Sequence, residues 1–240
     1  TRLVRTNKSL NVMLGDALLG RTVDPLGRGL FSEKILRSDL HEERSIDIRP
    51  LGIDARARIK RSLATGSTLV DMMVPLGKGQ KELVIGDRKT GKSAFLFTTM
   101  KNQINEGSIA IYAAIGKKKS DIKHLKELIK AEGIDSKSVI VASSSDDSPS
   151  LIYLTPFTAM TIAEYFRDQG HDVLLILDDL STHSRYYREI ALLAKSFPGR
   201  DSYPGDIFYT HARLLERAGN FIHEQKGEVS ITCLPVIETV

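Results

Sequence analysis

A stretch of eight residues in the first half of the chain has the residue types and spacing of a phosphate-binding loop. It follows the pattern G-x-x-x-x-G-K-[ST] and consists of Gly86, Asp87, Arg88, Lys89, Thr90, Gly91, Lys92 and Ser93. Glycine at both ends permits the backbone conformations that aim successive N–H groups at phosphate oxygens. The Lys92 ammonium would contact the β- and γ-phosphates, and the Ser93 hydroxyl would bind Mg²⁺. This stretch predicts a nucleotide site.

The sequence on both sides gives the loop its expected context. An apolar run at 83–85 predicts a short buried strand before it, and the apolar residues 94–97 predict a helix after it. The N-terminus of such a helix directs the positive end of its dipole at a bound anion. An ordinary glycine-containing turn is the alternative interpretation, and the context on both sides disfavours it.

A second candidate ligand for the metal follows another apolar run. Residues 174–177 are Leu-Leu-Ile-Leu, and Asp178 comes directly after them. An aspartate there would hold Mg²⁺ through its water shell, while Ser93 binds the metal directly. Many ordinary strands also end in aspartate, so the assignment depends on the phosphate-binding loop earlier in the chain. The predicted metal ligands are Ser93 and Asp178.

From residue 81 onward, strand-like and helix-like segments alternate. We expect strands at 83–85, 108–115, 139–142, 173–177 and 229–234, and helices at 92–106, 120–131, 153–168, 182–195 and 205–219. Pro156 predicts a later start for the helix at 153–168. Strands this apolar predict a parallel sheet covered by helices on both faces. Ligands of such sheets lie beyond the carboxyl ends of the strands, where the loop 86–93, Gly116-Lys117 and Asp178-Asp179 are expected to converge.

Composition and charge limit the class of protein. The 240 residues are 41% hydrophobic and 27% charged, with a net charge of +4, as in a globular protein. The basic pI near 9.1 is weak evidence for nucleic-acid binding, because both signs of charge are mixed along the chain. The single cysteine, Cys233, cannot form an internal disulfide and fits a reducing compartment. No apolar run is long enough to span a membrane.

Several segments resemble the alpha subunit of F-type rotary ATP synthases. They are 86–93, 114–118, 164–168, 178–181, 198–200 with 203–206, 213–217 and 234–239. Residues 18–27 resemble the last strands of that family's N-terminal β-barrel, and 75–80 resemble its lead-in to the nucleotide domain. The similarity runs from end to end and in order. Gly-Asp-Arg at 86–88, Tyr-Pro-Gly-Asp at 203–206 and Arg-Leu-Leu-Glu-Arg at 213–217 favour an alpha over a beta subunit.

The resemblance implies a fold and an assembly. The fold is α/β: a parallel-sheet, RecA-like P-loop NTPase domain at 51–240, preceded by the incomplete end of a small β-barrel at 1–50. It implies a non-catalytic subunit that binds Mg-ATP (or ADP) in a hexameric ring with catalytic beta-type subunits. A central rotor-shaft subunit would face the loop at 198–206, whose alternative reading is a surface turn. The complex would lie at the cytoplasmic or matrix face, reaching the membrane through other subunits and contacting no nucleic acid.

One position departs from the family pattern and bears on catalysis. In the beta subunits of this family a glutamate after the glycine of the second strand polarises the attacking water, and alpha subunits usually carry glutamine there. This chain has Lys117. An ammonium that stays protonated cannot accept a proton from water, so the resemblance implies a nucleotide that is held but not hydrolysed, with no catalytic residue in this chain. Lys89 also replaces a glutamine, and Ser93 replaces a threonine but keeps the hydroxyl.

Three other functions stay open. A ring-shaped helicase or transcription terminator acting on RNA would share the lead-in at 77–80, but it would need the missing glutamate and a basic strand with aromatic residues that stack on bases. An F-type-like ATPase subunit in a specialised motor complex would explain the substitutions at Lys89 and Lys117. A structural subunit that binds no nucleotide is disfavoured by the intact Lys92, Ser93 and Asp178.

Lys117 and Lys89 are expected to add positive charge near the γ-phosphate and so favour ATP over ADP. The alternative is that Lys117 simply begins the solvated lysine run 117–119. We expect Lys117→Gln to lower the ratio of ATP affinity to ADP affinity, measured by calorimetric titration of both nucleotides. An unchanged ratio would contradict the electrostatic hypothesis.

Overall fold

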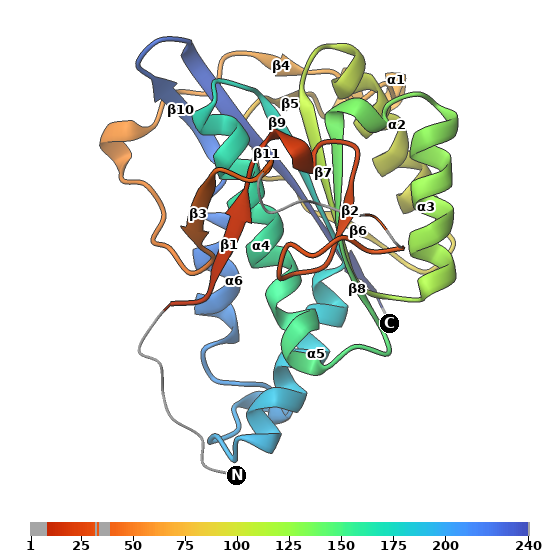
Figure 1. Ribbon diagram of the computed structural model, residues 1–240, viewed down its shortest axis with the longest axis vertical. Coiled ribbons are helices and arrows are strands. Elements are labelled where there is room, and N and C mark those ends of the chain that lie inside the picture. The colour runs from red at the N-terminus through yellow and green to blue at the C-terminus, as the bar shows by residue number, and fades with distance from the viewer. Residues whose placement is uncertain (1–8, 32, 34–38, 240) are drawn as a thin grey trace.

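A mostly parallel sheet runs through the centre of the computed structural model, which describes residues 9–31, 33 and 39–239 (Figure 1). In spatial order its strands are β10 (Gly219–His223), β11 (Gly227–Glu238), β9 (Val173–Asp178), β7 (Ile109–Lys117), β8 (Ser138–Ser144) and β2 (Thr22–Val23), with β6 (Val84–Gly86) beside the end of β11. β10 is antiparallel to β11, and the other described pairings of this sheet are parallel. The expected α/β class is confirmed.

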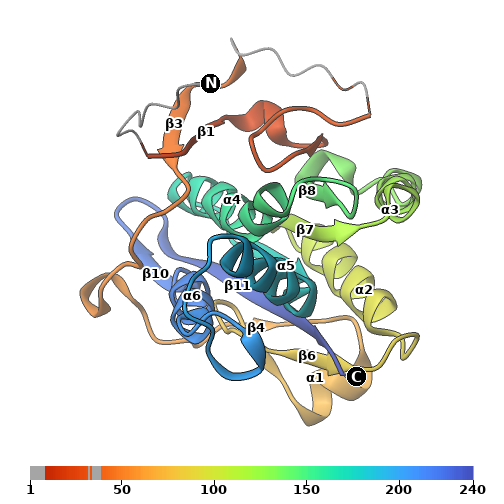
Figure 2. The same ribbon diagram turned by 90° about the horizontal axis from the view of Figure 1, so that it is seen from below.

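Helices cover both faces of this sheet (Figure 2). One face carries α4 (Pro149–Asp168), α5 (Leu180–Leu193) and α6 (Ile207–Leu215), and the other carries α2 (Lys92–Asn105) and α3 (Lys119–Ala131). None of these helices, nor any other in the described ranges, is long and apolar enough to cross a membrane.

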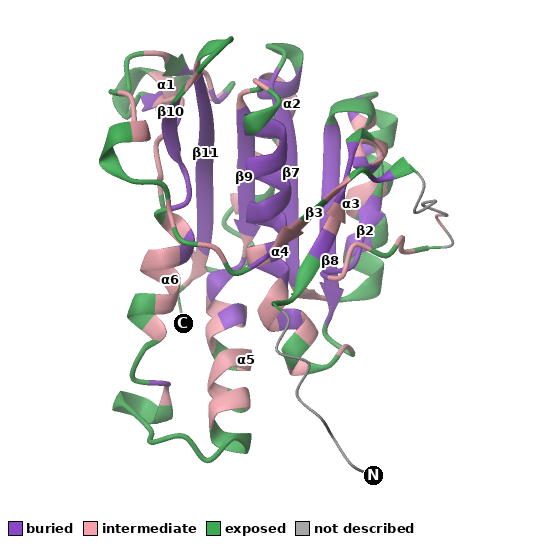
Figure 3. Ribbon diagram, turned by 60° about the vertical axis from the view of Figure 1, so that its left-hand side comes forward, coloured by how far each residue is buried: buried purple, intermediate pink, exposed green. Residues whose placement is uncertain are grey.

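The central strands are apolar throughout because both of their faces are buried. In β7, Ile109, Ile111, Ala113 and Ile115 pack on the side of α4, whereas Ala110, Tyr112 and Ala114 pack on the side of α2 and α3. β9 alternates in the same way. Figure 3 shows the central strands as a buried layer, with exposed residues in the loops and along helices such as α3.

The N-terminal residues attach to this domain in two ways. β1 (Asn11–Leu14) and β3 (Glu42–Ser45) form an antiparallel pair beside α4 (Figure 2), and β2 adds to the main sheet parallel to β8. Short 3₁₀ helices in this part of the chain lie at Asp16–Leu18 and Ile53–Ala55, and another at Asp135–Lys137 leads from α3 into β8. Residues 1–8, 32 and 34–38 of the expected barrel end lie outside the described residues. The division into a barrel end and a nucleotide domain stays a prediction.

Between the N-terminal strands and the main domain, the chain is mostly irregular. β4 (Ser62–Leu63) pairs with β5 (Leu76–Gly77), and the short helix α1 (Thr68–Met73) lies between them. Another 3₁₀ turn lies at Arg200–Ser202, in the segment between α5 and α6.

The prediction of a late start for the helix at 153–168 was wrong. α4 begins at Pro149, and Pro156 lies inside it. The Ser148 side chain caps the helix by accepting a hydrogen bond from the Leu151 N–H at 3.4 Å, and a proline at the first helical position is already set to the helical φ. The bond that Pro156 cannot donate is offset by packing, because Ile152, Ala159 and Met160 on the same helix are fully buried.

The end of the predicted helix at 205–219 was also wrong. α6 stops at Leu215, and the chain turns into β10 at Gly219. β10 is a short edge strand held by the backbone of β11 and by the Asn220 side chain, which donates to the Arg58 carbonyl at 2.9 Å. Only Phe221 and Ile222 of its five residues have apolar side chains, so the sequence shows no apolar run there and the strand was missed.

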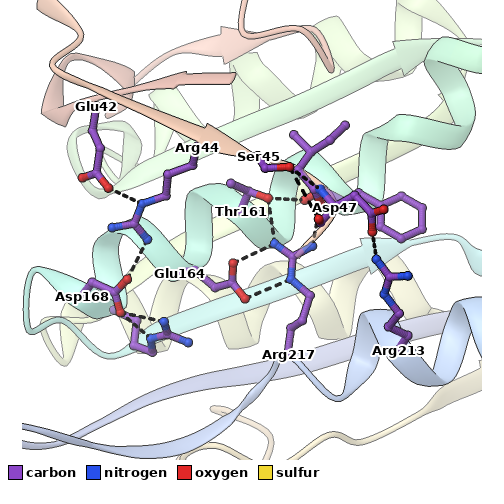
Figure 4. A network of polar contacts seen from close by, with 12 residues as sticks. Glu42, Arg44, Ser45, Asp47, Thr161, Glu164, Asp168, Arg213 and Arg217 are labelled. Carbon is purple, nitrogen blue, oxygen red and sulfur yellow. Dashed lines mark hydrogen bonds and ion pairs between the residues drawn. The ribbon is translucent and has the colours of Figure 1, made fainter. Parts of the chain in front are cut away.

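A buried arginine joins the N-terminal strands to the main domain (Figure 4). The Arg217 guanidinium, 2% exposed, forms two hydrogen bonds with the Glu164 carboxylate of α4, at 2.9 and 2.7 Å. It also donates to the Ile46 carbonyl just after β3 at 2.9 Å and to the Thr161 hydroxyl at 2.7 Å. Two further ion pairs, which are more exposed, lie on either side of the Arg217–Glu164 pair: Arg44 with Asp168 and Arg213 with Asp47. Three parts of the chain therefore meet at one buried charge.

We expect Arg217→Ala to lower the free energy of unfolding by about 3–5 kcal/mol, because it leaves the Glu164 carboxylate buried without a partner. Urea denaturation measures this change. Arg200→Ala is the control: that side chain is 97% exposed, and we expect a change within about 0.5 kcal/mol. The double variant Arg217→Met with Glu164→Leu should recover much of the loss, since no buried charge remains. Equal effects of the two single variants would contradict this account.

Candidate nucleotide-binding site

The predicted phosphate-binding loop lies between the end of β6 and the start of α2. Gly91 precedes α2 with φ +92°, and Lys89 has φ +63°, so two residues of the loop adopt left-handed conformations. A Cβ on Gly86 would lie 2.8 Å from the Thr90 hydroxyl, so a larger residue does not fit. The Thr90 hydroxyl in turn donates to the Asp87 carbonyl at 2.7 Å. The loop therefore folds back on itself as a tight turn.

The Lys92 side chain reaches back over this turn. Its ammonium donates to the carbonyl of Gly86 at 2.7 Å and to that of Asp87 at 2.5 Å. The positive charge is thus held at the loop, together with the N-terminal end of the dipole of the fourteen-residue helix α2. Left-handed turns at a helix N-terminus aim backbone N–H groups at anions. The residues present fit the phosphates of a nucleotide.

Two side chains of the loop contact the end of β11. Arg88 pairs with Glu238 at 3.3 Å, and the Thr239 hydroxyl donates a hydrogen bond to the Asp87 carboxylate. Asp87 and Arg88 would therefore serve the site through their backbone, while their side chains fix the loop. Sequence reasoning gave Glu238 and Thr239 no part in the site, because nothing in the sequence shows that β11 runs beside β6.

The ends of β7 and β9 bring Lys117, Asp178 and Asp179 together. The Lys117 ammonium donates to Asp178 Oδ1 at 2.8 Å and to Asp179 Oδ2 at 3.0 Å. The Tyr112 hydroxyl donates to the other oxygen of Asp178 at 2.6 Å. Asp179 also caps α5 by accepting a hydrogen bond from the Thr182 N–H at 2.6 Å. Tyr112 was missed, although a tyrosine in a buried strand indicates a hydroxyl that needs a partner.

Three of these groups, Tyr112, Lys117 and Asp178, open onto one cavity. Its volume is about 280 Å³, and Ser93, Tyr112, Lys117 and Asp178 line it together with residues of α3. The cavity thus extends from Ser93, the last residue of the phosphate-binding loop, to the ends of β7 and β9. The predicted metal ligands Ser93 and Asp178 share it.

The charges in this cavity are fixed by their surroundings. Burial alone would lower the pKa of Lys117, but the neighbouring Asp178 and Asp179 carboxylates outweigh it, and its pKa is raised. Burial, with the charge of Asp178, raises the pKa of Tyr112 well above its ordinary value. At neutral pH the lysine is therefore an ammonium and the tyrosine a neutral donor. Pairing with two carboxylates offsets the Lys117 charge, so the preference for ATP over ADP stays a prediction with a smaller expected effect.

The protein groups fit a metal that arrives with the nucleotide. Within the described ranges, no cluster of three or more His, Cys, Asp or Glu side chains could hold a metal ion. The Asp178 carboxylate offers about four lone-pair positions, of which the Tyr112 and Lys117 donors occupy two. The others can accept hydrogen bonds from water ligands of Mg²⁺, and the Ser93 hydroxyl lies on the same cavity. Phosphate oxygens would complete the coordination.

We expect Gly91→Ala to weaken ATP binding by about 5- to 30-fold, because a Cβ disfavours the left-handed turn that binding requires by about 1–2 kcal/mol. Gly133→Ala is a matched control, since Gly133 also has positive φ and open space around a Cβ but ends α3 away from the loop. Gly133→Ala should lose stability without losing ATP affinity, and Gly91→Ala should lose ATP affinity in calorimetric titrations. Equal ATP affinities would contradict a role of the loop in binding.

Comparison with known proteins gives this site its context. Residues 66–240 match the model of the ATP synthase alpha/beta family, nucleotide-binding domain. ATP synthase subunit alpha of Clostridium botulinum (strain Alaska E43 / Type E3) is 43% identical over 98% of this chain and 46% of its own length. ATP synthase subunit alpha of Acholeplasma laidlawii (strain PG-8A) is 45% identical over 98% of this chain and 46% of its own length.

A further relative has the same extent of similarity. ATP synthase subunit alpha 2 of Nitrosospira multiformis is 43% identical over 98% of this chain and 45% of its own length. The chain thus spans just under half the length of these relatives. The family match contains the whole phosphate-binding loop, Lys117 and Asp178. With its mostly parallel sheet and this loop, the chain belongs to the ATP synthase alpha/beta family.

Proposed function

We propose that this chain carries the nucleotide-binding domain of an alpha-type subunit of an F-type rotary ATP synthase or ATPase. Its own site holds ATP or ADP with Mg²⁺ and does not hydrolyse it. One observation carries the second statement: Lys117, at the position where the family resemblance implies a catalytic glutamate in beta subunits, hydrogen-bonds to two carboxylates as an ammonium.

Lys117, at the position where a catalytic glutamate is expected in beta subunits, supplies no base for the attacking water. Hydrolysis of ATP needs a residue that orients water or accepts its proton. A lysine ammonium has three donors and no acceptor. Asp178 accepts from Lys117 and Tyr112, and Asp179 is 3% exposed and engaged by Lys117 and the N-terminus of α5. Asp179 is thus fully engaged within the protein, and Asp178 keeps only the positions that water ligands of Mg²⁺ would use.

Binding itself has its usual components. The loop 86–93 and the dipole of α2 would receive the phosphates, with the Lys92 charge above them. Mg²⁺ supplies charge neutralisation to the phosphates when bound, held by the Ser93 hydroxyl and, through water, by Asp178. The Lys92 ammonium would exchange its contacts with the loop carbonyls for phosphate oxygens.

We further propose that the chain assembles with beta-type subunits in a hexameric ring around a central rotor-shaft subunit, peripheral to a membrane on its cytoplasmic or matrix side. Support comes from the names of the relatives, which are alpha subunits of ATP synthases. Large apolar side chains are also exposed from the end of α5 to α6, among them Phe197 at 97% and Phe208 at 83%. Exposed apolar patches of this kind mark contacts with other proteins.

We expect the full-length protein to retain ATP that is recovered unhydrolysed at this site. Lys92→Ala should weaken binding about 10- to 100-fold, because it removes a charged hydrogen bond worth about 1.5–3 kcal/mol. Lys101→Ala is the control, since that lysine lies on the same helix but pairs with Glu132 on the surface. Radiolabelled ATP, acid quench and chromatography measure the bound species.

Two outcomes would contradict the proposal. One is ADP formation that persists when the catalytic sites of the partner subunits are disabled and disappears with Lys92→Ala. The other is a wild-type protein that binds no nucleotide in Mg²⁺ buffer, which would favour a purely structural subunit.

A further inference from the structure

We propose that Lys117 is a tethered cation beside the metal position of the nucleotide site, so that nucleotide binding here depends less on Mg²⁺ than it would with a neutral residue. The inference rests on the proposed function, because it assumes that the loop 86–93 binds a nucleotide. In this arrangement Lys117 and the hydrated metal would share the Asp178 carboxylate.

The geometry places the ammonium where the hydrated metal would act. Lys117 Nζ lies 2.8 Å from Asp178 Oδ1, on the carboxylate that would accept hydrogen bonds from the water ligands of Mg²⁺. It also lies 3.0 Å from Asp179 Oδ2. An ammonium has three N–H donors, and these contacts use two. The side chain lines the cavity that Ser93 shares, so the third donor can serve a phosphate oxygen.

An irregularity in β7 brings the lysine to this side of the sheet. Side chains of a strand alternate between faces, and strict alternation would place Lys117 with Ile115, on the side of α4. The register of β7 against β8 shifts between Ala114 and Lys117, and Gly116 has φ +60°. Lys117 therefore lines the cavity on the same side as Tyr112 and Ala114. Irregularities of this kind re-aim a side chain.

The lysine changes the charge of the site. Lys117 (+1), Asp178 (−1) and Asp179 (−1) together carry −1, whereas a neutral residue in place of the lysine would leave −2. These side chains are 25%, 13% and 3% exposed, so salt screens them less than surface charges. A charge of −2 would repel the phosphates of a metal-free nucleotide more strongly and attract Mg²⁺ more strongly. Lys117 thus neutralises part of the negative charge that Mg²⁺ would otherwise have to neutralise in this site.

Calorimetric titration of the full-length protein with ATP, once in Mg²⁺ buffer and once in EDTA, tests this inference. The measured quantity is the factor by which Mg²⁺ strengthens ATP binding. We expect that factor to be at least about tenfold larger for Lys117→Gln than for the wild type, mainly because binding in EDTA weakens. Lys118→Gln is the matched control: it makes the same change of charge at an exposed neighbour, and its factor should equal that of the wild type.

The outcomes separate this inference from the proposed function. Equal factors for the wild type and Lys117→Gln, with ATP bound in both, overturn the tethered cation and leave the proposed function intact. A wild type that binds no ATP in either buffer overturns the proposed function. If Lys117→Gln does not fold, Asp179→Asn takes its place. It keeps a residue that caps helices and removes one negative charge, so the factor should fall at least about threefold, and an unchanged factor contradicts the inference.

Discussion

The site depends on one constraint: β7 and β9 are parallel neighbours, so their carboxyl ends meet at the same edge of the sheet. The pairing places Ala114 opposite Asp178, and the shift after Ala114 brings Lys117 onto the two aspartates. Because both faces of these strands are buried, the register cannot slip without moving apolar side chains to the wrong face. The packing of the sheet therefore fixes the charges at its edge.

A second buried charge organises the other side of the molecule. Arg217 links the turn after α6 to α4 and to the backbone just after β3. The pair is shielded from water, so its partners are specific and its loss would be costly. The end of β3 is thus tied to the main domain by one buried charge, with more exposed ion pairs around it (Figure 4), in addition to the apolar packing of β1 and the pairing of β2 with β8. The nucleotide site lies at the strand ends, apart from this junction.

Much of this architecture could be predicted from the sequence, and the misses have physical causes. The apolar strands and the glycine-lysine loop are local patterns, so β6, the loop and α2 were predicted within a residue or two. Pro156 misled because local propensity was outweighed by the Ser148 cap and core packing. The contacts of Lys117 with Asp178 and Asp179 depend on a shift of register at Gly116, which no local pattern encodes.

A structure of the full-length protein determined with Mg²⁺ and a non-hydrolysable ATP analogue would test the account most directly. It predicts the triphosphate on the loop 86–93 and the Lys117 ammonium still within hydrogen-bond distance of Asp178, with no protein carboxylate facing a water in line with the γ-phosphate. An empty loop would contradict the account. So would a Lys117 side chain turned away from Asp178 while a carboxylate of this chain positions the attacking water.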